Sequence, residues 1–138
     1  MKKLSAVLMF FFCFTAMLFA QNLFDLAPRG TPEQVQAAIN AGAKIDDRDP
    51  VGATPLMRAA AWNKNPDVIT TLLNAGAKID HKDIFGETPL MYAAKSNINP
   101  DVITILLNAG SKVDERDQYG QTPLMYAAKS NINPDVIT

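Results

Sequence analysis

After an apolar N-terminal segment, the chain alternates short apolar stripes with polar turns. Leu56, Ala59 and Ala60 are spaced i, i+3 and i+4, which predicts a helix with one narrow apolar face. The segment 68–73 carries two overlapping i, i+4 rows of Val, Ile and Leu, which predicts a second helix with a wider buried face. The polar stretch 78–85 then predicts an exposed, extended turn.

Capping residues indicate where both helices begin and end. Thr54 precedes Pro55, and Asn65 precedes Pro66, so each pair offers a side-chain cap followed by a residue without an N–H group to satisfy. Gly76 supplies the left-handed residue that ends the second helix. Helices this short are marginally stable alone, so the unit needs neighbours.

The unit repeats every 34 residues. Thr-Pro-Leu-Met occurs at 54–57, 88–91 and 122–125, and Asn-Pro-Asp-Val-Ile-Thr occurs at 65–70, 99–104 and 133–138. The segments 52–85 and 86–119 are identical at 22 of 34 positions. Stacked copies bury each other's apolar faces, so we predict an all-α repeat solenoid.

The repeats also set the expected domain boundaries. These are 21–51 for an N-terminal capping unit, 52–85 and 86–119 for complete units, and 120–138 for a partial unit. In the capping unit, Thr31-Pro32-Glu33-Gln34 fits a capping box that opens a helix. The partial unit copies 86–104 with a single change, Glu87 to Gln121. We interpret the chain as an incomplete piece of a longer array, because uncovered solenoid ends are poorly tolerated.

The order of the motifs resembles the ankyrin repeat. Gly-x-Thr-Pro-Leu-x-x-Ala-Ala, Leu-Leu-x-x-Gly-Ala and Asp-x-x-Gly-x-Thr-Pro follow one another from about Asn22 to the last residue. The resemblance implies antiparallel helix pairs with β-hairpin or loop fingers and a concave inner face. Family members mostly bind other proteins.

Two departures from the family pattern carry structural expectations. Met57, Met91 and Met125 stand where the family usually has His, so the polar network that this His makes between repeats should be missing. The unit is one residue longer than usual, and the extra residue lies in the inter-helix loop 63–66.

The N-terminal segment 1–20 predicts a bacterial-type secretory signal peptide. Two lysines precede the apolar run from Leu4 to Ala20, and Ala20 is a small residue suited to cleavage. An uncleaved anchor is the alternative, since the run is just long enough to span a bilayer. Either reading places the rest of the chain outside the cytoplasm, secreted or periplasmic. Cleavage removes the only cysteine, Cys13.

Charge argues against nucleic acid as a partner. The formal net charge of −1 becomes −3 once Lys2 and Lys3 leave with the signal peptide. Nucleic-acid affinity depends on clustered Lys and Arg, which this chain lacks. No later run is long enough to cross a membrane, so we expect no membrane contact after signal removal.

The residues give little support to catalysis, and we predict no enzyme, no metal and no cofactor. His81 is the only histidine, lies in a predicted turn, and has Glu115 as its counterpart one period later. Asp49, Asp83 and Asp117 each precede a Gly by three residues, which favours hydrogen bonds to the local backbone over a cation site.

Recognition is the function that the resemblance implies. The predicted protein-binding residues, mostly at the positions that vary in the ankyrin pattern, are Val51, Arg58, Trp62, Ile84, Phe85, Glu87, Tyr92, Lys95, Gln118, Tyr119 and Gln121. Val51, Phe85 and Tyr119 would form an apolar column along the fingers, and exposed aromatic anchors of this kind dominate interfaces. The alternative for Phe85 and Tyr119 is packing against the adjacent hairpin.

We therefore expect a monomeric, exported protein that binds a protein partner through its fingers and concave face. A second interpretation is a structural spacer or immunity-like array without a tuned surface. The near-identity of residues 86–104 and 120–138 favours that alternative, because a surface tuned for one target usually diversifies.

Overall fold

The computed structural model describes residues 23–130. The predicted signal peptide and residues 131–138 lie outside the described residues. The helices are α2 (Leu23–Leu26), α3 (Pro32–Asn40), α4 (Pro55–Trp62), α5 (Pro66–Asn74), α6 (Pro89–Ser96), α7 (Pro100–Asn108) and α8 (Pro123–Ser130). Within residues 23–130 there is no strand, so the predicted all-α repeat fold is confirmed.

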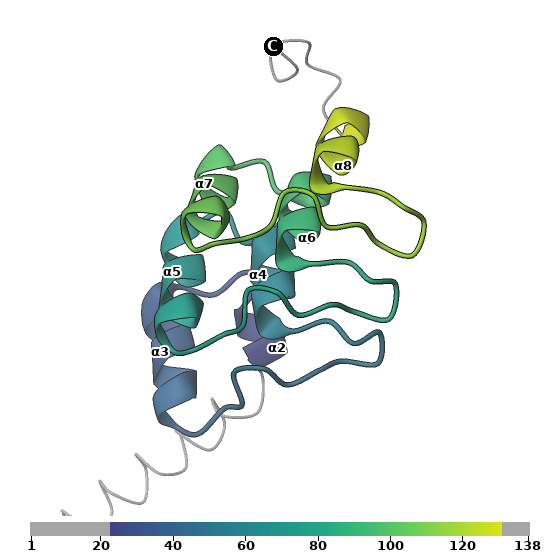
Figure 1. Ribbon diagram of the computed structural model, residues 1–138. Coiled ribbons are helices and arrows are strands. Elements are labelled where there is room, and N and C mark those ends of the chain that lie inside the picture. The colour runs from purple at the N-terminus through teal and green to yellow at the C-terminus, as the bar shows by residue number, and fades with distance from the viewer. Residues whose placement is uncertain (1–22, 131–138) are drawn as a thin grey trace, which may run out of the picture.

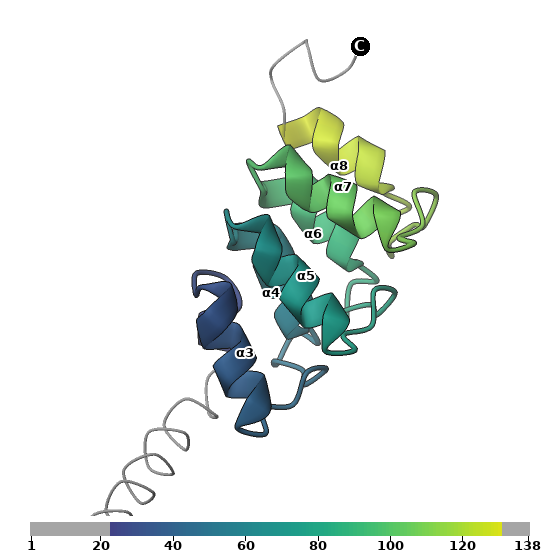
Figure 2. The same cartoon turned by 90° about the vertical axis from the view of Figure 1, so that its left-hand side faces the viewer.

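The helices stack in two layers. Helices α2, α4, α6 and α8 form one layer, and α3, α5 and α7 form the other (Figures 1 and 2). Between successive helix pairs the chain runs out into three loops on one side (Figure 1). We call these loops finger 1 (residues 43–53), finger 2 (77–87) and finger 3 (111–121).

The predicted caps are present at the helix starts. Thr54 Oγ1 accepts a hydrogen bond from the Met57 amide at 3.3 Å, and Asn65 Oδ1 accepts one from the Asp67 amide at 3.0 Å. The capping box expected at the start of α3 is also formed, with Thr31 and Gln34 bonded reciprocally. Each cap satisfies amide groups that the first helical turn leaves without partners.

The core lies between the layers and consists of the predicted apolar stripes. Leu56, Ile69, Leu72 and Leu106 are fully buried. Alanines such as Ala59 are also fully buried, and their small side chains allow α4 and α6 to pack closely. At the far end of the stack, Leu124 on α8 is 75% exposed, although it occupies the repeat position of Leu56.

Two asparagines make hydrogen bonds between repeats, while methionines occupy the position of the usual histidine. Met57 and Met91 are fully buried, in keeping with their apolar side chains. The Asn63 amide donates to the carbonyl oxygens of Ala27 and Gly30 at 2.9 and 3.0 Å. Asn97 repeats the arrangement one unit later. The loop that holds the extra residue of the unit therefore links consecutive repeats.

The fingers are held together edge to edge by their backbones. The Ile84 amide donates to the Val51 carbonyl at 3.0 Å, which joins finger 2 to finger 1. Gly52 lies at the turn with φ +77°, and a Cβ there would lie 3.2 Å from the Ile84 nitrogen. Glycine is thus required both by the left-handed backbone and by the approach of the next finger.

Candidate functional site

One aspartate organises the tip of each finger. Asp49 Oδ1 accepts hydrogen bonds from the amides of Val51 and Ala53 at 3.0 and 2.9 Å. Asp83 and Asp117 accept the equivalent pairs of amides in fingers 2 and 3. The predicted role of these aspartates as turn residues is confirmed, and each fingertip has a fixed backbone.

The second carboxylate oxygen of each aspartate accepts a hydrogen bond from the helix that follows its finger. Asp49 Oδ2 accepts hydrogen bonds from Nε and Nη2 of Arg58 on α4, with Nε at 3.0 Å. In finger 2 Asp83 Oδ2 accepts one from the hydroxyl of Tyr92 on α6 at 2.8 Å, and in finger 3 Asp117 Oδ2 accepts one from the hydroxyl of Tyr126 on α8. Each fingertip aspartate is thereby bound to a helix residue nine positions later in the chain.

These contacts shift the pKa values of Asp49 and Tyr92 in opposite directions. Partial burial raises the pKa of Asp49, but hydrogen bonds from Arg58 and from two backbone amides outweigh it, so the net pKa lies below its ordinary value. Burial, the hydrogen bond to Asp83 and the nearby negative charges raise the pKa of Tyr92 far above its ordinary value. At neutral pH Asp49 is therefore ionised and Tyr92 is protonated, as their hydrogen bonds require.

Glu87 and Lys95 bind each other, and both contact Tyr126 of the next repeat. Glu87 is only 7% exposed, and its carboxylate lies 2.6 Å from Lys95 Nζ and 2.8 Å from the Tyr126 hydroxyl of the next repeat. The Lys95 ammonium also lies 4.9 Å from the centre of the Tyr126 ring, within the range of a cation–π contact. One carboxylate oxygen of Glu87, Oε1, accepts both of these hydrogen bonds.

The predicted binding residues therefore divide into two groups. The first group makes hydrogen bonds within the molecule, through Nε and Nη2 of Arg58, Oε1 of Glu87, the hydroxyl of Tyr92 and Nζ of Lys95. The second group lies on the outer surface or close to it and contains Val51, Trp62, Ile84, Phe85, Gln118, Tyr119 and Gln121.

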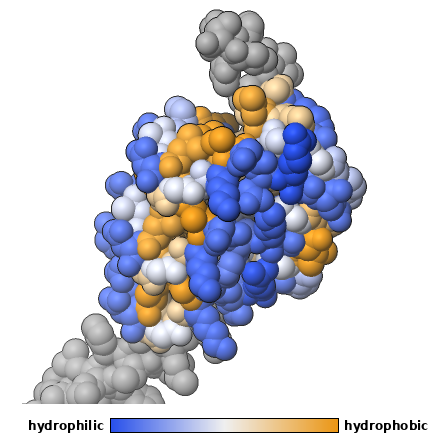
Figure 3. Space-filling model, viewed as in Figure 1, coloured by the Kyte–Doolittle hydropathy of each residue, from blue (hydrophilic) through white to orange (hydrophobic). Residues whose placement is uncertain are grey.

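The exposed group is rich in apolar surface at the fingertips. Ile84 is 61% exposed, Phe85 37% and Tyr119 69%, while Val51 is half-buried. A hydrogen bond of 2.9 Å from the Gln118 amide to the Phe85 carbonyl joins finger 3 to finger 2. Figure 3 shows a compact apolar patch over the fingertips, surrounded by polar surface. The fingers thus present apolar side chains on a fixed backbone.

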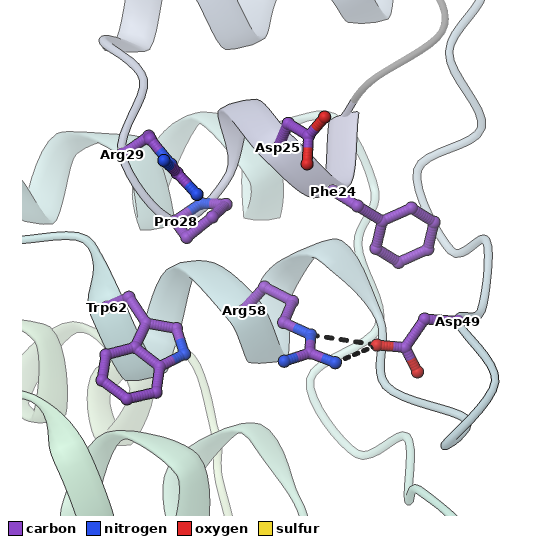
Figure 4. A pocket seen from close by; sticks show the side chains of 7 residues that line it. All are labelled: Phe24, Asp25, Pro28, Arg29, Asp49, Arg58 and Trp62. Atoms are coloured by element: carbon purple, nitrogen blue, oxygen red, sulfur yellow. Dashed lines mark hydrogen bonds and ion pairs between the residues drawn. The ribbon is translucent and has the colours of Figure 1, made fainter.

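A second feature lies between α2 and α4. An open cavity of about 630 Å³ is lined by Phe24, Asp25, Pro28, Arg29, Asp49, Arg58 and Trp62 (Figure 4). Trp62 is 59% exposed at the end of α4. Phe24, Asp25, Pro28 and Arg29 did not figure in the sequence prediction, because nothing in the local pattern links α2 to α4. The cavity brings together the aromatic rings of Phe24 and Trp62 and the guanidinium groups of Arg29 and Arg58, from the capping unit and from α4.

The histidine of the chain, His81, lies in finger 2. His81 Nδ1 lies 3.8 Å from Asp46 Oδ1, a loose contact between adjacent fingers. Across residues 23–130, no cluster of three or more His, Cys, Asp or Glu side chains could hold a metal ion. Among the described helices, none is long and apolar enough to span a bilayer.

Comparison with known proteins agrees with the geometry. Residues 56–138 match the family model for ankyrin repeats, in three copies. No curated protein matches the sequence. The matched segment contains helices α5 to α8 and fingers 2 and 3, so it covers most of the stack described above.

Proposed function

Because the chain belongs to the ankyrin repeat family, we propose that it is an exported module that binds a protein partner through its fingertips and the neighbouring face of α4. Ankyrin repeats are generally protein–protein interaction modules, and the family is typically non-enzymatic. The partner surface is expected to be apolar at its centre, because the fingertips offer Val51, Ile84, Phe85 and Tyr119.

The observation that carries this proposal is the exposure of large apolar side chains on a fixed backbone. Ile84 and Tyr119 are more than half exposed, although each is attached to a hydrogen-bonded finger. Little conformational entropy is lost when such a pre-ordered surface binds, so more of the contact energy appears as affinity. Aromatic residues in this position are typical anchors of protein interfaces.

The experiment compares partner capture by two variants. The triple variant Trp62→Ala, Phe85→Ala, Tyr119→Ala is expected to lose the partner that the native chain captures from the compartment into which it is exported. Ile98→Ala is the matched control, because Ile98 is 77% exposed in the α6–α7 loop, away from the fingers. Unchanged capture by the triple variant, with an unchanged circular dichroism melt, would exclude this surface.

Export belongs to the same proposal and rests on the predicted signal segment. Expression of the full chain in a bacterium should release a product that begins at about Gln21, which mass spectrometry of the periplasmic fraction can identify. A product that keeps Met1 and sediments with membranes would favour the uncleaved anchor instead.

The spacer remains as a second candidate function, because residues 86–104 and 120–138 differ at one position only. A spacer predicts that the triple surface variant keeps full biological activity. It also predicts that removal of one 34-residue unit, 86–119, abolishes activity, because the length of the array changes.

A further inference from the structure

The first complete repeat differs from its copies at two positions that line the α2–α4 cavity. Arg58 stands where the later repeats have Tyr92 and Tyr126, and Trp62 stands where they have Ser96 and Ser130. Both Arg58 and Trp62 face the cavity (Figure 4). A cavity with this lining therefore belongs to the first repeat and is not a general feature of the array.

We propose that this cavity binds an extended peptide segment of the partner that carries one carboxylate side chain next to an apolar side chain. The inference rests on the proposed function and specifies the chemistry of one part of the binding surface. The carboxylate would meet the Arg58 and Arg29 guanidinium groups, and the apolar side chain would lie on the Trp62 indole.

Arg58 has donors to spare for such a carboxylate. A guanidinium has five N–H donors, and Arg58 uses only Nε and Nη2 toward Asp49. Its Nη1 has no hydrogen bond to any described residue and lies on the side of the guanidinium away from Asp49 (Figure 4). Because the Asp49 contact fixes the guanidinium, a second carboxylate can be bound at Nη1 without further ordering of the side chain.

The balance of charge limits the ligand to a single carboxylate. Asp49 is saturated, since Oδ1 accepts two backbone amides and Oδ2 accepts Arg58. Asp25 is the other acid on the wall, and it would repel a run of acidic residues. One carboxylate near Arg58 and Arg29 gains the favourable contacts, whereas a second would meet Asp25.

The aromatic part of the cavity favours an apolar neighbour in the peptide. Trp62 leaves 59% of its surface exposed to solvent, which is a large apolar area for a residue at the edge of a cavity. Phe24 lines the same cavity from α2. A leucine or aromatic side chain of the ligand would cover apolar surface on Trp62 that is otherwise in contact with water.

The chain itself supplies the variants for a test. Arg58→Tyr copies the later repeats, in which the Tyr92 hydroxyl already occupies the same place at 2.8 Å from Asp83, so the finger should keep its support. Trp62→Ser copies Ser96 in the same way. Both variants should therefore fold normally, which the thermal melt by circular dichroism checks.

The probe is a random peptide library displayed on phage and selected on the chain from residue 21 onward. Selected peptides are expected to share one Asp or Glu beside an apolar residue, and to bind Arg58→Tyr and Trp62→Ser at least about tenfold more weakly. Replacing the shared acid by its amide should weaken binding to the native chain to a similar degree.

Three results would overturn the inference: no enrichment of peptides, enriched peptides without a shared acid, or binding to both variants that is as strong as binding to the native chain. Peptides that are lost with Phe85→Ala but kept by Arg58→Tyr would place recognition at the fingertips alone. In that case the proposed function stands and the assignment of the cavity fails.

Discussion

The side-chain amide of Asn97 donates a hydrogen bond of 3.0 Å to the backbone carbonyl of Asn63, its own counterpart in the preceding repeat. Asn63 in turn donates to Ala27 and Gly30 of the capping unit. Residues one period apart are therefore bonded to each other along the stack. This series of contacts holds the inter-helix loops together on the side away from the fingers.

Asn63→Ala should lower the free energy of unfolding by about 2–3 kcal/mol, because two buried carbonyl groups lose their donor. Asn63 is only 4% exposed, so water cannot readily replace the amide. Urea titration measures the loss. Lys64→Ala is the control, since Lys64 is exposed in the same loop, and a loss for Asn63→Ala no larger than for Lys64→Ala would contradict the assigned role.

Leu56 and Leu124 occupy the same repeat position in opposite surroundings, which allows a matched pair of substitutions. Leu56→Ala should cost about 2–5 kcal/mol of stability, because Leu56 is fully buried in the core. Leu124→Ala should change stability by about 0.5 kcal/mol or less, because Leu124 is 75% exposed. Chemical denaturation of both variants checks the difference, and equal losses would show that Leu124 is covered in solution.

A comparison of Gly52→Ala with Gly120→Ala separates the cost of a left-handed backbone from the cost of a steric contact with the next finger. Both have positive φ, +77° and +75°, so alanine should cost about 1–2 kcal/mol at either position. At Gly52 alone, the new Cβ would also lie 3.2 Å from the Ile84 nitrogen, whereas nothing lies within 4 Å at Gly120. Gly52→Ala should therefore melt at a lower temperature than Gly120→Ala. Identical melting temperatures would mean that finger 2 moves away from the new Cβ without a loss of stability.

Stability should fall on the acid side as Asp49 takes up a proton. The folded state lowers the pKa of Asp49 below its ordinary value of 3.8, so its contribution is complete above that pH and is lost as the pH falls through the lower folded value. Asp49→Asn should be less stable than the native chain near neutral pH and should show a flatter acid limb. Denaturation at several pH values measures both effects. If the stability of the variant and of the native chain fell equally steeply with decreasing pH, the prediction would be wrong.

Most of the fold followed from local patterns in the sequence. The caps at Thr54 and Asn65, the apolar stripes and the period of 34 residues depend on neighbours within one helix turn or on simple repetition. The turn role of Asp49 was also predicted, because its two amide partners lie within four residues.

The contacts that the sequence did not predict join residues that are far apart in the chain, or join a loop to a helix. Arg58 and Tyr92 were predicted as surface contacts, but each bonds an aspartate nine residues earlier, a separation that no helix or strand period indicates. Asn63 lies in a polar loop, which normally suggests solvent exposure. Its recurrence as Asn97 was the available signal, since a position kept between copies is a candidate for a contact between them.

The asparagine series also bears on how such a molecule can grow. A duplicated unit brings an asparagine whose side-chain amide donates to the preceding unit and whose backbone carbonyl accepts from the following unit. The contacts on both sides of the new unit therefore form without any compensating change elsewhere. Adding whole units would then change the length of the stack and the number of its fingers, while the hydrogen bonds between neighbouring units stay the same.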